Sequence, residues 1–140
     1  MAVIPYNEAD VKLLARLMRA EAEGEGRLGM LMVGNVGVNR VAAKCLDFKD
    51  VNSIDRMVNQ RPGGFEATQK GYFYQKARGS EIALARKVIK GGKYHPASSS
   101  LWFFKPQGNC PGQWYDQSNA GRFKSHCFYQ PSQSDCPQIF

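Results

Sequence analysis

Glu21 is the residue whose type and position first suggest chemistry. At helical spacing it continues the apolar stripe formed by Leu14, Leu17 and Met18. A carboxyl group at the edge of an apolar face is partly removed from water, which raises its pKa. A carboxylic acid that keeps its proton near neutral pH can protonate a leaving oxygen, as cleavage of a glycosidic bond requires. Glu21 is therefore a candidate general acid. The alternative is an ordinary carboxylate at a helix end, where the helix dipole slightly disfavours it.

Two more carboxylates, Glu23 and Glu25, follow in the same turn. Together with Glu21 they offer oxygen ligands of the kind that bind calcium. The cluster lacks the alternating Asp/Asn spacing of a calcium-binding loop, so we expect solvated surface carboxylates instead. The sequence thus predicts no metal site and no cofactor required for chemistry.

The four cysteines, Cys45, Cys110, Cys127 and Cys136, can pair in three ways, and the spacing does not choose among them. The N-terminus shows no basic region followed by a long apolar run, so we expect no signal peptide, a reducing compartment and free thiols. A zinc site could use Cys127 with His126 and either Cys136 or Cys110. The spacing disfavours zinc, because adjacent residues rarely ligate one ion and no C-x2-C pair is present.

Aromatic residues gather in the second half of the chain, where they could stack on sugar faces: Trp102, Phe103, Phe104, Trp114 and Tyr115. Side chains alternate along a strand, so Trp102 and Phe104 share one face and Phe103 takes the other. We expect one face to pack into the core and the other to line a groove. Trp114 falls in a predicted loop, which favours a binding role.

Two N-terminal helices must position Glu21. The first is predicted over residues 8–22, capped by Asn7 and Asp10 and stopped by glycines at 24 and 26. The second is predicted over residues 28–41 and is apolar nearly all round, which is typical of a buried helix. Gly34 and Gly37 lie one turn apart on it and predict the close approach of another backbone. Asn39 and Arg40 are expected to end its buried stretch.

The rest of the chain predicts shorter elements. Ser53 caps a short helix through Asn59, and Ser80 caps a helix over residues 81–90. Residues 60–65 read as a turn or loop. Aromatic-rich strands are expected over residues 100–104 and 122–130, separated by a surface loop, and the tail after Pro131 is expected to be loosely held. The class is therefore α+β, with helices first and a small late antiparallel sheet, in a single domain over residues 1–140.

Composition limits the function classes. The chain has 140 residues, 43% hydrophobic and 22% charged, which suits a folded domain and argues against disorder. No apolar run approaches the roughly 20 residues that span a bilayer, so membrane insertion is not expected. The net charge of +7 favours polyanionic partners, acidic glycans included. A nucleic-acid partner is not expected, since no recognised nucleic-acid-binding motif is present.

Five segments in order resemble the SleB/CwlJ family of cell-wall hydrolases. They are LARLMRAEAEGE at 14–25, GNVGVNR at 34–40, Gln60 with FEA at 65–67, LWFFKP at 101–106 and SHCF at 125–128. The first contains the family's Glu-Ala-x-Gly-Glu motif, and the third has one added residue, Arg61, before its proline. The resemblance covers nearly the whole chain. The short length and GYFYQ at 71–75 resemble the CwlJ branch, the spore cortex-lytic enzymes without a separate wall-binding domain.

The resemblance implies a lysozyme-like or resuscitation-factor-like catalytic core in which Glu21 is the one essential glutamate. It implies spore-cortex peptidoglycan as the substrate, cut during germination by lytic transglycosylase or glycosidase chemistry. In a lytic transglycosylase the muramyl 6-hydroxyl closes on the anomeric carbon, so one acid/base suffices. Glu66 stands where relatives of the SleB type often carry a hydroxyl. As a second carboxylate it could activate water in a true hydrolase, or it could bind substrate or cap a turn.

Most of the remaining site expectations also follow the family motifs, whereas Trp114 follows from its ring and its place in a predicted loop. The expected substrate-binding residues are Gln60, Phe65, Glu66, Trp102, Phe104, Trp114 and His126. On the residues alone, His126 reads as a buried histidine satisfied by a hydrogen bond, and the motif places it near Glu21. The resemblance further implies deposition in the spore coat next to the cortex, a spore-coat partner protein and activation by calcium dipicolinate. The competing hypothesis is a non-catalytic spore-coat protein that binds glycan.

Overall fold

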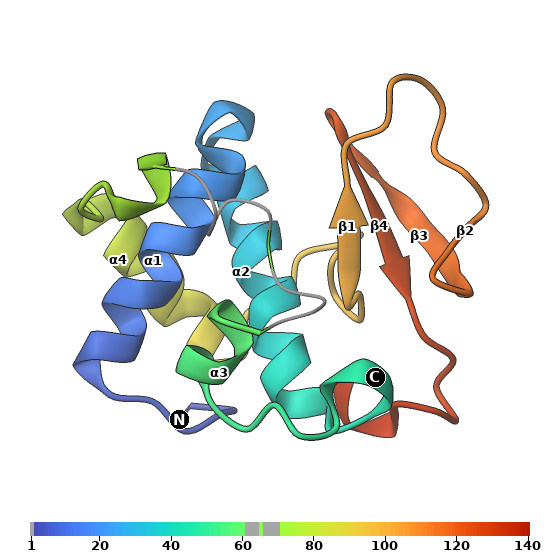
Figure 1. Ribbon diagram of the computed structural model, residues 1–140, viewed down its shortest axis with the longest axis horizontal. Helices are drawn as coiled ribbons and strands as arrows, with labels where there is room; N and C mark the ends of the chain where they lie inside the picture. Colours follow the sequence, from blue (N-terminus) through green and yellow to red (C-terminus); the bar gives the residue numbers. More distant parts are fainter. Residues whose placement is uncertain (1, 61–64, 66–70) are drawn as a thin grey trace.

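The computed structural model describes residues 2–60, 65 and 71–140, in which a group of helices packs beside an antiparallel sheet (Figure 1). The helices come first: α1 (Glu8–Ala22), α2 (Gly26–Ala43), α3 (Ile54–Val58) and α4 (Gly79–Ile89). The strands follow: β1 (Trp102–Phe104), β2 (Gln113–Trp114), β3 (Gln117–Phe123) and β4 (His126–Gln130). This order confirms the predicted α+β class. None of the helices among the described residues is long and apolar enough to cross a membrane.

Helix α1 has the predicted bounds and ends beside the candidate acid. Its N-terminus is a capping box: Asp10 N donates to the Asn7 side chain at 2.8 Å, and Asn7 N donates to the Asp10 carboxylate at 3.0 Å. Its apolar stripe is buried against the core, with Leu14 and Leu17 fully covered. A 3-10 turn, Glu23–Glu25, then leads into α2.

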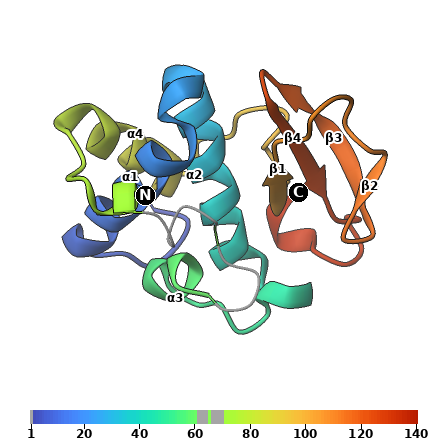
Figure 2. The same ribbon diagram turned by 45° about the horizontal axis from the view of Figure 1, so that its top comes forward.

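Helix α2 runs through the middle of the molecule, between α1 and α4 on one side and the sheet on the other (Figures 1 and 2). It is two residues longer at each end than predicted, and it is buried over nearly its whole length. A Cβ added at Gly34 would lie 2.9 Å from Met18 Sδ and 3.0 Å from Val88 Cγ2, so side chains, rather than a second backbone, pack onto the glycine. Asn39 and Arg40 do not end the buried stretch as expected, because both are buried themselves.

Helix α4 begins earlier than predicted, and Arg78 caps it instead of Ser80. Glu81, which is 1% exposed, accepts a hydrogen bond from Arg78 N at 2.8 Å and thereby forms the capping box. Ser80 lies inside the first turn, where its hydroxyl donates to the same carboxylate at 2.9 Å. The prediction that Ser80 caps the helix was wrong. The Arg78 side chain forms an ion pair with the buried Glu81 carboxylate, and the helix begins directly after Arg78.

The four strands among the described residues form an antiparallel sheet in the order β1-β4-β3-β2, so β1 and β2 are its edges. The predicted strand over 122–130 is in fact a hairpin: the chain reverses at Lys124, whose φ is 50°, and β3 pairs back on β4. Most of β3 and all of β2 lie in the stretch predicted as a loop. Apart from Trp114 and Phe123 their residues are polar or small, and they lack the β-branched pattern that marks a strand.

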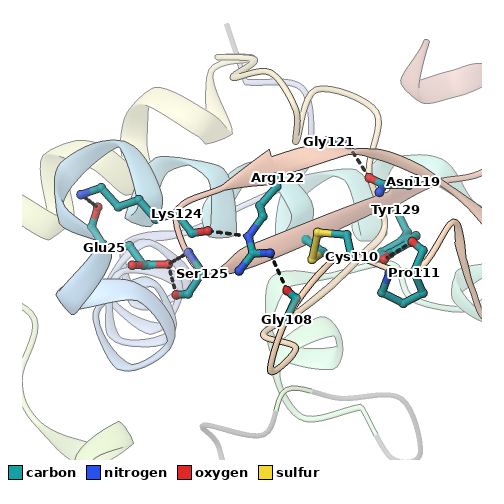
Figure 3. The surroundings of a disulfide bond; sticks show 11 residues. Glu25, Gly108, Cys110, Pro111, Asn119, Gly121, Arg122, Lys124, Ser125 and Tyr129 are labelled. Atoms are coloured by element: carbon teal, nitrogen blue, oxygen red, sulfur yellow. Dashed lines mark hydrogen bonds between the residues drawn. A yellow bond between two sulfur atoms is a disulfide. The ribbon is translucent and has the colours of Figure 1, made fainter.

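Two disulfides correct the expectation of free thiols: Cys45 pairs with Cys136, and Cys110 pairs with Cys127. The first anchors the tail after Pro131, which is not loosely held, because Cys136 is fully buried and the Ser99 hydroxyl donates to the carbonyl of Ile139 at 2.8 Å. The second ties the β1–β2 connection to β4 (Figure 3). Thiols were predicted from the N-terminus, which says nothing about pairs that the fold brings together.

Candidate active site

A cleft of about 1050 Å³ lies between the end of α1, the α3 region and the edge strand β1. Polar and apolar side chains share its wall, as in small-molecule sites that combine apolar contacts with a few placed polar groups. The lining residues are Glu21, Arg40, Asp47, Phe48, Asp50, Val51, Asp55, Arg56, Asn59, Gln60, Phe65, Trp102, Phe103, Phe104, Lys105, Trp114, Tyr115 and His126.

Glu21 lies in the last turn of α1 and lines this cleft. Its side chain is neither fully exposed nor sealed inside the core. The apolar stripe that precedes it is buried, so the helix presents the carboxyl where its covered face reaches the cleft. The position combines partial removal from water with access for a ligand, which is what a general acid needs.

Arg40 of α2 lines the cleft, although the sequence predicted it only as a polar end of the buried stretch and as part of a family segment. Its guanidinium lies between the rings of Phe48 and Phe65, at 4.6 and 4.3 Å from their centroids, and its Nε donates to the carbonyl of Leu101 at 2.8 Å. Burial lowers its pKa to about 9, while the charge of Glu21 acts in the opposite direction. Arg40 therefore stays positively charged at neutral pH, close enough to interact electrostatically with the candidate acid.

Residues of β1 and of the segment 114–115 give the cleft an aromatic lining. Trp102 and Tyr115 stack with their ring centroids 6.4 Å apart, and Phe104 and Trp114 stack at 4.1 Å. Trp114 is 36% exposed and lies in β2 rather than in a loop. The expectation that only one face of β1 meets the groove is wrong: Phe103 also lines the cleft, because β1 is an edge strand that the cleft can reach from both faces.

His126, the first residue of β4, lines the cleft and bonds to Glu25 rather than to Glu21. Its Nδ1 lies 2.8 Å from Glu25 Oε1, and its side chain is 3% exposed. Burial lowers the pKa of His126, although Glu25 acts against that shift. Burial alone would raise the pKa of Glu25, but hydrogen bonds from Ser125 and His126 outweigh it and lower the pKa.

Glu25 therefore corrects the expectation of a solvated carboxylate, whereas Glu23 fulfils it. Glu23 is exposed and pairs with Arg19 at 3.3 Å and Arg78 at 2.6 Å. Sequence reasoning missed the partners of Glu25 because they lie about 100 residues away. The described residues contain no cluster of histidine, cysteine and acidic side chains that could hold a metal ion. The cysteines considered for zinc are paired in disulfides.

The other predicted binding residues divide into those in the cleft and one outside the described residues. Gln60 and Phe65 line the cleft, and Gln60 Nε2 donates to the carbonyl of Asp47 at 3.1 Å. Glu66 lies outside the described residues. Asp47, Asp50 and Asp55 also line the cleft, although no motif pointed to them.

Comparison with known proteins assigns the family. A family model described as Cell Wall Hydrolase matches residues 24–129, well over half of the chain. The chain belongs to the cell wall hydrolase family. Glu25, Arg40 and His126 lie within the matched residues, and Glu21 lies just before them.

Full-length relatives of this cell wall hydrolase are named "Cell wall hydrolase CwlJ". The relative from Oceanobacillus iheyensis is 69% identical over 140 residues and covers 100% of this chain and 99% of its own. Those from Halalkalibacterium halodurans and Bacillus subtilis are 63% and 58% identical, each covering 100% of this chain and 98% of its own.

Solved structures add the fold. The catalytic domain of the Bacillus cereus SleB protein matches with a TM-score of 0.70 at 23% identity, covering 93% of this chain and 98% of that domain. The catalytic domain of the germination-specific lytic transglycosylase SleB from Bacillus anthracis matches with a TM-score of 0.70 at 22% identity, covering 91% and 100%. At this identity the likeness supports the lysozyme-like fold type and nothing finer.

The Glu25–His126 pair predicts how the stability of this cell wall hydrolase depends on pH. The lowered pKa of His126 means that the unfolded chain, with an ordinary histidine pKa of 6.5, is protonated before the folded protein, so stability falls as the pH drops below 6.5. The lowered pKa of Glu25 extends the loss below its ordinary value of 4.5. Urea unfolding from about pH 7.5 to about pH 4 measures the effect.

The matched control for this measurement is His126→Asn, which removes the titrating ring. In that variant the first part of the decline should be smaller than in the wild type. Stability that stays constant or rises as the pH falls from 6.5 towards 4.5 would contradict the assignment of a neutral, buried His126 beside a charged Glu25.

Proposed function

We propose that this cell wall hydrolase cleaves the glycan strand of spore-cortex peptidoglycan during germination, with Glu21 as the general acid and base. The observation that carries the proposal is the position of Glu21, half-buried in a large cleft that stacked aromatic rings also line. Aromatic rings can bind the apolar faces of sugars. In this arrangement the Glu21 carboxyl would meet the glycosidic oxygen that joins two sugars. The names of the CwlJ relatives and of the SleB lytic transglycosylase support the substrate and the setting.

The reaction needs two proton transfers at Glu21. In the first, the carboxylic acid gives its proton to the glycosidic oxygen as the bond from the anomeric carbon to that oxygen breaks. In the second, the carboxylate takes a proton from the hydroxyl that bonds to the anomeric carbon. When that hydroxyl is the muramyl 6-hydroxyl, the product is an anhydro sugar, and Glu21 ends the cycle protonated. We favour this route because it needs a single acid/base.

The same proposal places the enzyme in the spore coat next to the cortex. That position, a spore-coat partner protein and activation by calcium dipicolinate remain predictions from the family resemblance. The proposed chemistry itself requires no cofactor, because the acid, its conjugate base and the attacking hydroxyl are all supplied by the chain and the glycan.

Product analysis tests the proposed function. Purified enzyme is incubated with isolated spore-cortex peptidoglycan, and the released fragments are analysed by mass spectrometry. We expect soluble fragments with anhydro-muramyl ends. New reducing ends would assign a hydrolase that uses water, with a second carboxylate such as Glu66 as its base. Tight retention on the cortex without new ends of either kind would contradict an enzyme and favour the glycan-binding alternative.

A further inference from the structure

We propose that His126 binds a hydroxyl group of the glycan through Nε2, and that Glu25 is the positioning residue that holds the imidazole ring for this task. The inference deepens the proposed function and rests on it. It assigns a role to a carboxylate and a histidine that the chemistry at Glu21 does not use.

The hydrogen bond at Nδ1 fixes which nitrogen of His126 carries the hydrogen. Glu25 Oε1 lies 2.8 Å from Nδ1 and also accepts a hydrogen bond from the backbone N of Ser125 at 3.0 Å. An ionised carboxylate can only accept, so Nδ1 must donate. In the neutral ring, Nε2 is then an acceptor with a free lone pair. Burial, which lowers the pKa of His126, favours that neutral ring.

The second ring nitrogen of His126, Nε2, is available to a ligand in the cleft. His126 lines the cleft, and its neighbouring rings are apolar: Phe103 at 5.4 Å, edge to face, and Phe128 at 6.2 Å between centroids. Among the described residues, the side chain of His126 makes its hydrogen bond to Glu25 and no other. Within the part of the chain that the structure describes, Nε2 is not one of the buried side-chain atoms that lack a partner, so it is reachable from the cleft. A hydroxyl of a bound sugar can donate a hydrogen bond to an acceptor in this position.

The chain supports Glu25 from several sides, as a positioning residue requires. Figure 3 shows its carboxylate directed at Ser125, in the turn between β3 and β4. Its backbone carbonyl accepts a hydrogen bond from Lys124 Nζ at 3.0 Å. Glu25 thus links the turn that follows Glu21 to the start of β4. This link fixes the position of His126 relative to the end of α1, which carries Glu21. A purely structural role for the pair is the alternative that the test must separate.

Two substitutions at His126 separate these roles. In His126→Asn, the amide nitrogen takes the place of Nδ1 and keeps the bond to Glu25, but no atom replaces Nε2. In His126→Gln, the longer amide reaches the place of Nε2 and gives up the bond to Glu25. We expect His126→Asn to unfold at nearly the wild-type temperature and to lose about tenfold in the rate of cortex cleavage, as expected for a lost substrate hydrogen bond. His126→Gln should be less stable but should cleave faster than His126→Asn.

The matched control is His95→Asn, since His95 is exposed and lies outside the cleft. It should cleave at the wild-type rate. Wild-type activity in His126→Asn, or activity that follows stability across both variants, would overturn the role of Nε2 while leaving the proposed function in place. Failure of the wild type to cleave cortex glycan would instead contradict the proposed function.

Nitrogen-15 NMR of the imidazole provides a readout that a structural role would not change. The wild type should show His126 protonated at Nδ1, and Glu25→Ala should mix the two tautomers. Titrating Glu21→Gln with soluble cortex glycan fragments should shift the Nε2 resonance in the direction of an accepted hydrogen bond. A wild-type ring protonated at Nε2, or an Nε2 resonance that does not change when these fragments bind, would overturn the inference.

Discussion

Glu21→Gln is expected to slow glycan cleavage by about 10²–10⁴-fold while leaving the fold intact, which is the size of effect that a general acid supplies. The amide has nearly the shape of the carboxylic acid but cannot give up a proton to the leaving oxygen. Because Glu21 lies in a cleft and not in the sealed core, the variant should still fold, with some loss of stability from removing the negative charge near the buried Arg40. The release of muropeptides from decoated spores measures the rate, and circular dichroism checks the fold.

Glu23→Gln is the matched control, because it makes the same chemical change two residues further along the same helix end. Glu23 is exposed, pairs with Arg19 and Arg78, and does not line the cleft. Its loss should leave cleavage close to the wild-type rate. If Glu21→Gln cleaves the cortex as fast as this control, the carboxyl is not the acid, and the mechanism proposed above is wrong.

Replacing both Cys45 and Cys136 with Ser should lower the free energy of unfolding more than replacing both Cys110 and Cys127 with Ser. The Cys45–Cys136 bond closes a loop with a sequence separation of 91, for which chain entropy gives a loss of about 4 to 5 kcal/mol. The Cys110–Cys127 bond closes a separation of 17, for which the same relation gives about 3 kcal/mol. Denaturant unfolding of the two double-serine variants measures the difference.

Activity should rank the two variants the other way. Cys110 lies in the connection that carries Trp114 and Tyr115 to the cleft, and its partner Cys127 follows His126 directly. For the same loss in the free energy of unfolding, the Cys110/Cys127 variant should therefore show a larger fall in the rate of glycan cleavage than the Cys45/Cys136 variant. Equal stability losses in the two variants would contradict the predicted order of stability. A wild-type rate of glycan cleavage in the folded Cys110/Cys127 variant would contradict the predicted role of that disulfide in activity.

Local patterns predicted the helices that carry the site better than they predicted the sheet. The bounds of α1 and its Asn7 cap could be read from spacing, because the apolar stripe and the capping box lie within a few residues of one another. Burial of α2 followed from an apolar surface all round. Most of strand β3 could not be found in this way: residues 117–122 are polar or small, and the pairing with β4 depends on a reversal at Lys124.

The site divides along the same line. Placing Glu21 in a cleft needed only the apolar face that ends in a carboxyl and the family motif. Trp102 and Phe104 followed from the aromatic segment at 101–106, and Trp114 from its ring in a predicted loop. The partners of Glu25, the aromatic sandwich around Arg40 and the pairing of the cysteines all join segments far apart in the chain. Patterns of neighbouring residues contain no information about contacts between distant segments, so these contacts were visible only in the folded structure.

The edge position of β1 has a consequence for how the protein behaves at high concentration. An open strand edge invites another chain to add a strand, and its length sets how well that chain can bind. Here the edge at β1 is short, with three residues. This edge offers a second chain only a few backbone hydrogen bonds, so copies of the protein should not join sheet to sheet through β1.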